Sequence, residues 1–61
     1  MNAGTQEHPL RWESRGKDVY CANGAWFMRD PESNWIKDWV RASPSFANDI
    51  RAAVESGEIH P

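Results

Sequence analysis

The sequence predicts a small α+β domain in which an antiparallel β-sheet of three to four strands packs against one C-terminal helix. Two segments lead to this prediction: a β-hairpin centred on Asn23-Gly24 and an amphipathic helix that ends near Gly57. The chain has 61 residues, so it can form one domain with a single small core.

The N-terminal part of the chain predicts a tail followed by an outer strand. The first eight residues are small or polar and show no periodicity, so we expect a disordered tail over residues 1–8 and a single domain over residues 9–61. Residues 10–14 fit a strand at the edge of the sheet. Leu10 and Trp12 would share one side of it, because side chains alternate along a strand.

A polar turn over residues 15–17 leads into the hairpin. Residues 18–22 and 25–30 form its two strands, because both runs combine aromatic or β-branched side chains. They are joined by Asn23-Gly24, the dipeptide preferred in a two-residue type I′ turn. Large apolar side chains fall on both sides of the hairpin. The helix could cover one face, and a partner or a tryptophan at the sheet edge could cover the other.

The stretch after the hairpin is compatible with two structures. Residues 30–34 fit either a loop rich in turn residues or the capped start of a helix. Over residues 35–41 the apolar spacing fits a helical stripe, whereas the β-propensity of Trp, Ile and Val favours a strand. Both alternatives place Trp35 and Trp39 on the same side.

A helix is predicted over residues 43–57. Ser43 is a favourable N-cap, Pro44 suits the first helical position, and Gly57 suits the C-terminal end. The apolar side chains recur at three- and four-residue steps and form one stripe, comprising Phe46, Ile50, Ala53 and Val54. Beyond the glycine, Ile59 can fold back against the end of the helix.

Composition excludes several classes of protein. The formal net charge is −2 with acidic and basic residues interspersed, which argues against direct nucleic-acid binding through a basic face. The single cysteine, Cys21, has no partner for an internal disulfide, and the sequence contains neither a signal segment nor an apolar run that could span a bilayer. We expect a reduced, cytoplasmic protein with no membrane association.

No set of residues indicates catalysis or a cofactor. Cys21 could be combined with His8 and His60 as metal ligands or as a nucleophile with its base, but no pair has metal-ligand spacing and both histidines lie in expected tails. Cys21 is better explained as a core thiol. Two of the three carboxylates Asp30, Glu32 and Asp38 could be proposed as an acid-base pair. Solvated or capping groups are the simpler interpretation of all three. We therefore expect a non-enzymatic protein without a metal or cofactor.

The four tryptophans suggest a binding surface, because a domain of this length has few positions at which an indole ring can be fully buried. In the alternative, purely structural interpretation they cover the sheet and fill the core beneath the helix. Aromatic residues next to cations are the composition expected at the centre of a protein interface. The predicted interface residues are Trp26, Trp35, Trp39, Lys37, Arg29 and Arg41.

The hairpin and helix together resemble a small actinobacterial domain family typified by BldB-like developmental regulators and by the short partners of WhiJ-type (XRE) helix-turn-helix regulators. The similar residues are Trp12-Glu13-Ser14, Cys21, the run Phe27-Met28-Arg29-Asp30, Ser43-Pro44 at the start of the helix, and residues 52–59. The run at residues 27–30 is similar to a valine-arginine-aspartate-serine run of the family. The resemblance covers roughly residues 10–60.

The resemblance implies that residues 35–40 form a strand, and it implies a function. The protein would be a non-enzymatic interaction module, a co-regulator or toxin-antitoxin-like partner of a helix-turn-helix transcription regulator, which self-associates as a homodimer or binds that regulator. Two alternatives come from other classes. One is a small nucleic-acid-binding domain that uses the Trp, Arg and Lys side chains, and the other is a phage or mobile-element inhibitor of a host enzyme.

Overall fold

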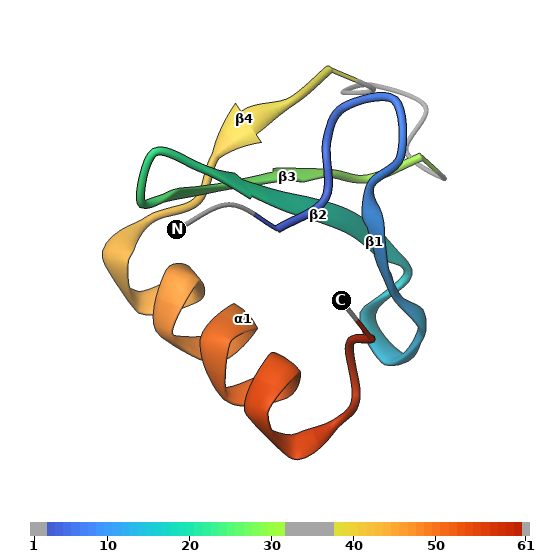
Figure 1. The fold of residues 1–61 in the computed structure, drawn as a ribbon, viewed down its shortest axis with the longest axis vertical. Coiled ribbons are helices and arrows are strands. Elements are labelled where there is room, and N and C mark those ends of the chain that lie inside the picture. Colours follow the sequence, from blue (N-terminus) through green and yellow to red (C-terminus); the bar gives the residue numbers. More distant parts are fainter. Residues whose placement is uncertain (1–2, 32–37, 61) are drawn as a thin grey trace.

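The protein folds into a four-stranded antiparallel sheet with one helix packed against one of its faces (Figure 1). The structure, a computed structural model, describes residues 3–31 and 38–60. The strands follow one another in the sheet in chain order, and the elements are β1 (Leu10–Trp12), a short 3₁₀ helix (Glu13–Arg15), β2 (Lys17–Ala22), β3 (Ala25–Arg29), β4 (Val40–Arg41) and α1 (Pro44–Ser56). The predicted α+β fold is confirmed. No described helix is long and apolar enough to cross a membrane.

The helix begins and ends at the residues that its sequence indicates. The Ser43 hydroxyl accepts a hydrogen bond from the backbone N–H of Phe46 at 3.3 Å, which satisfies one of the N–H groups that have no partner in the first turn. Gly57 adopts φ 88° and closes the helix. After it, Ile59 donates its backbone N–H to the carbonyl of Ala53 at 3.2 Å, and its side chain is completely buried. Ile59 thus folds back as predicted.

The hairpin also forms at the predicted dipeptide. Asn23 has φ 53° and Gly24 has φ 79°, the pair of positive values that a type I′ turn requires. The register continues from this turn to the far end of the hairpin, where Asp18 faces Arg29. β3 ends at Arg29, one residue earlier than expected.

The first strand is shorter than predicted. β1 ends at Trp12, because residues 13–15 form the 3₁₀ helix and Gly16 donates its backbone N–H to the carbonyl of Glu13 at 3.2 Å. A chain that turns in this way can no longer hydrogen-bond to β2. Leu10 and Trp12 do share one side of the strand, and both are buried.

The N-terminal segment pairs with the sheet. Ala3 and Cys21 exchange two backbone hydrogen bonds of 2.9 and 2.7 Å, so Ala3 extends the edge of the sheet beyond β1. Between Ala3 and Leu10 the chain leaves the ladder, and this loop rises on the side of the sheet opposite to α1 (Figure 1). The expectation of a disordered tail over residues 1–8 did not include this pairing, which depends on backbone groups and leaves no mark in the side-chain pattern.

The fourth strand is also shorter than the resemblance implied. Among the described residues β4 consists of Val40 and Arg41, which pair with β3, whereas the expected strand covered residues 35–40. Asp38 and Trp39 precede β4 and are not part of it. The remainder of the expected strand, residues 35–37, lies outside the described part of the chain.

The core lies between α1 and the face of the sheet turned towards it, which we call the inner face. It contains two tryptophans, Trp12 and Trp26, with 2% and 7% of their surface exposed. Cys21 is 2% exposed at the same face, as predicted for a core thiol. The buried residues of the cluster are Leu10, Trp12, Val19, Cys21, Trp26, Ile50, Ala53 and Ile59.

We expect Ile50→Ala to remove most of the stability of the domain. The side chain is fully buried under the sheet, and such a truncation costs about 2–5 kcal/mol, while a domain of this size has a free energy of unfolding of roughly 3–9 kcal/mol. Urea unfolding followed by circular dichroism measures the effect. Asp49→Ala, an exposed change on the same helix, is the control and should stay close to the unsubstituted protein. A loss below about 1 kcal/mol for Ile50→Ala would contradict the described core.

Candidate protein interaction surface

The sheet has a second face, turned away from α1, which we call the outer face. Strand alternation divides the side chains between the two faces, and the core residue Val19 pairs with Met28 while the next pair along is Tyr20 with Phe27. By this register, and by the ring contacts of Trp39, the outer face comprises Arg11, Asp18, Tyr20, Phe27, Arg29, Trp39 and Arg41.

Three aromatic rings form the centre of the outer face. Tyr20 stacks on Phe27 with ring centroids 4.9 Å apart and planes 15° apart, and Trp39 meets Tyr20 edge-on at 4.7 Å and 87°. Both are favourable arrangements for aromatic pairs. The Tyr20 hydroxyl accepts a hydrogen bond of 2.9 Å from Nε2 of Gln6 in the N-terminal loop. The loop therefore closes one side of the cluster and leaves Tyr20 only 8% exposed.

Asp18 organises the charged part of this face. One of its carboxylate oxygens accepts a hydrogen bond from Arg29 at 3.0 Å, and the other accepts one from Arg11 at 3.3 Å. The guanidinium of Arg29 also lies 4.6 Å from the centre of the Trp39 ring, within the range of a cation–π contact. The indole of Trp39 thus contacts both Tyr20 and a cation that is itself held by Asp18.

The outer face combines accessible apolar surface with positive charge. Trp39 is half-buried, and the side chains of Arg29 and Arg11 are 31% and 35% exposed, whereas Asp18 between them is 14% exposed. Among the described residues this face carries three arginines, Arg11, Arg29 and the exposed Arg41, of which the first two pair with Asp18 and Arg11 also lies near Glu13. Arg41 thus adds positive charge to the side of the sheet that no described helix covers.

The structure separates the predicted interface residues into three groups. Trp39, Arg29 and Arg41 come together on the outer face. Trp26 lies on the inner face, beneath the helix and within the core, apart from the other three. Trp35 and Lys37 lie outside the described residues.

Five described residues that form or contact the outer face were not among the predicted site residues: Gln6, Arg11, Asp18, Tyr20 and Phe27. Strand alternation had separated Tyr20 from its neighbours Val19 and Cys21, so its position opposite the core could have been used to identify it. For Gln6 the sequence offers no signal, because its contact depends on the path of the N-terminal loop. Asp18 pairs with Arg29 at the open end of the hairpin, where the register places the two residues opposite one another.

The outer face offers aromatic contact surface bordered by charged groups. Among the described residues, no three His, Cys, Asp or Glu side chains gather in a way that could hold a metal ion. His8 and His60 are exposed. What the outer face can do chemically is cover an apolar group of another molecule and pair with negative charge at its rim.

Comparison of the chain with protein-family models, with curated proteins and with solved structures gives no match.

We expect Asp18→Asn to destabilise the protein by about 1–3 kcal/mol, because two guanidinium groups lose the carboxylate that they share. The loss should be smaller at high salt, since ions screen the attraction that is being removed. Urea unfolding at low and high NaCl concentration measures both effects. Glu13→Gln removes a carboxylate that is 82% exposed and 3.6 Å from Arg11, and it should change the free energy of unfolding by less than about 1 kcal/mol. Equal effects of the two changes would contradict the role given to Asp18.

Proposed function

We propose that this protein is a non-enzymatic interaction module that binds another protein through the outer face of its sheet. The observation that supports the proposal is the arrangement around Trp39, an accessible indole held by Tyr20 and Arg29 at the centre of a face that no described helix covers. Tryptophan, tyrosine and arginine are the residues that most often dominate the energy of protein interfaces.

The packing around Trp39 favours binding for a second reason. An interface residue that is mobile in the free protein loses conformational entropy on binding, at a cost of about 0.5–1.5 kcal/mol for each such side chain. Here the contacts with Tyr20 and Arg29 already restrict the indole, and Asp18 restricts Arg29. A partner would meet a surface whose central groups are largely ordered.

The partner we propose is a transcription regulator of the helix-turn-helix class, with the protein acting as its co-regulator or toxin-antitoxin-like counterpart. This choice rests on the resemblance to BldB-like proteins and to the short partners of WhiJ-type regulators. The protein could also self-associate through the same face. The homodimer and the complex with the regulator would then compete for one surface. The surplus of arginines on the outer face suits a partner whose contact surface is acidic.

We expect Trp39→Ala to weaken binding to the regulator by at least about 30-fold, the effect of losing a residue worth about 2 kcal/mol at an interface. The measurement is isothermal titration calorimetry with helix-turn-helix regulators encoded by flanking genes, together with light scattering of the isolated protein. Val40→Ala is the matched control, because Val40 is the neighbouring large apolar residue, is 42% exposed, and faces the opposite side of the sheet with Met28.

Two results would contradict the proposed function, and they differ from each other. A Trp39→Ala protein that keeps its circular dichroism spectrum and its affinity for the regulator would remove the outer face as the binding surface. Oligonucleotide binding that falls steeply with salt and is lost in Trp39→Ala would replace the protein partner with a nucleic acid.

A further inference from the structure

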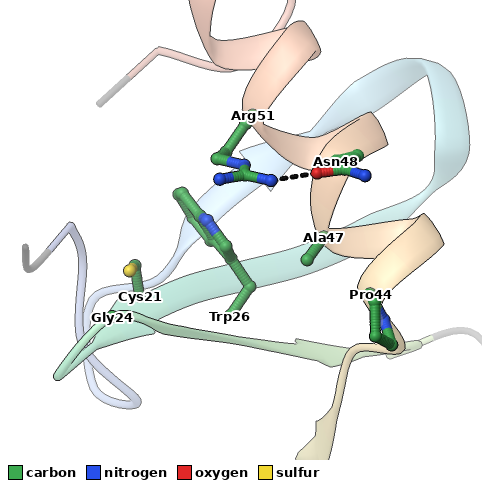
Figure 2. Close-up of a pocket in the computed structure, with 7 residues that line it drawn as sticks. All are labelled: Cys21, Gly24, Trp26, Pro44, Ala47, Asn48 and Arg51. Atoms are coloured by element: carbon green, nitrogen blue, oxygen red, sulfur yellow. Dashed lines mark hydrogen bonds between the residues drawn. The ribbon is translucent and has the colours of Figure 1, made fainter.

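A groove runs between the hairpin turn and the first two turns of α1. It consists of two adjoining cavities of about 360 and 350 Å³ that share four lining residues: Gly24, Trp26, Pro44 and Ala47. Figure 2 shows the first cavity, with the Trp26 ring rising from β3 towards the helix. We call this feature the hairpin groove. Its floor lies on the inner side of the sheet, away from the aromatic cluster of the outer face, and one of its ends reaches Arg41, which also belongs to the outer face.

The floor of the hairpin groove is apolar. Trp26 forms its centre, Cys21 lies on the side of the first cavity, and Pro44 and Ala47 form the wall on the helix. Trp26 is part of the core, so its ring is rigidly supported from below. Such a floor suits an apolar side chain of a ligand, which could leave water by packing against the indole.

The two ends of the groove carry positive charge. Arg51 lines the first cavity and Arg41 lines the second, and no Asp or Glu lines either of them. Figure 2 shows Arg51 reaching from the helix over Trp26, with its guanidinium hydrogen-bonded to the side chain of Asn48.

The other arginines and the lysine of the described chain are already occupied. Arg11, Lys17 and Arg29 pair with carboxylates, and Arg15 lies over the ring of Trp12. Within the same part of the chain, no carboxylate pairs with Arg41 or Arg51. The two cations at the groove are therefore the ones best able to receive negative charge from a ligand.

We propose that the hairpin groove binds an acidic peptide segment, with an apolar side chain of the peptide on Trp26 and its carboxylates paired with Arg41 and Arg51. Because an arginine lies at each end of the groove, a ligand with negative charge would be complementary to it. The surroundings favour a segment of a protein over a small molecule, because pockets for small molecules enclose most of the ligand surface, whereas Gly24, Pro44 and Arg51 on the groove wall are exposed.

The probe is a fluorescein-labelled hexapeptide, Glu-Asp-Leu-Phe-Asp-Glu, added to the full ¹⁵N-labelled chain. Two control peptides keep the central Leu-Phe and replace the acidic residues by Gln and Asn or by Lys. We expect the acidic peptide to bind and to shift the backbone amide resonances of Gly24, Ala47 and Asn48. The two control peptides should not bind. Fluorescence anisotropy gives the affinities.

Three variants test the contacts. Arg41→Gln and Arg51→Gln should each weaken binding about two- to fivefold, as expected for exposed charge pairs. Ala47→Leu should abolish binding by filling both cavities, and its fold is checked by circular dichroism. Arg15→Gln is the matched control, because it removes a positive charge from an exposed residue that lines neither cavity, and it should leave the affinity unchanged.

Several results would overturn the proposal: equal binding of the acidic and the amide peptide, shifts confined to the outer face, no shift at about 1 mM peptide, or benzoate shifting the same amides as strongly as the peptide. The proposal shares Arg41 with the function proposed for the outer face but does not involve Trp39. Trp39→Ala should bind the acidic peptide with unchanged affinity, so the two ideas can fail separately.

Discussion

A sheet backed by a single helix can cover only one of its faces with that helix, and this constraint accounts for the arrangement of the rest of the protein (Figure 1). The inner face receives α1, and Trp12 and Trp26 are buried there in the core. The outer face carries further aromatic residues, which pack on one another instead of beneath a second helix. The N-terminal loop adds partial cover through Gln6, and it leaves Trp39 half-buried.

Charge is distributed according to the same division. Asp18 lies in the middle of the outer face, where it can hold one arginine on each neighbouring strand, Arg11 on β1 and Arg29 on β3. This shared pairing keeps Arg29 over Trp39. Arg41 lies at the other limit of the face and also lines the hairpin groove, so the outer face and the groove meet at one cation. A partner with an acidic surface could therefore contact both regions at once.

Local chemistry was sufficient to predict the elements whose signals lie within a few residues. Ser43 caps the helix because its hydroxyl reaches an N–H group three residues further on, and Gly57 ends it because glycine tolerates positive φ. Asn23-Gly24 sets the turn and with it the register of β2 against β3. The prediction for residues 35–40 was less complete, since the pattern was compatible with a helix and a strand, and only Val40 of that range is paired in the described structure.

The sequence by itself thus determined the hairpin, the helix and the alternation of side chains along each strand, because these depend on backbone preferences and on contacts between near neighbours. Only the tertiary structure decided which face α1 covers, and so placed Trp26 in the core and Trp39 on the surface. It also decided the pairing of Ala3 with Cys21. Such contacts join residues that are far apart in the chain. They depend on packing and on backbone hydrogen bonds, which no short sequence pattern indicates.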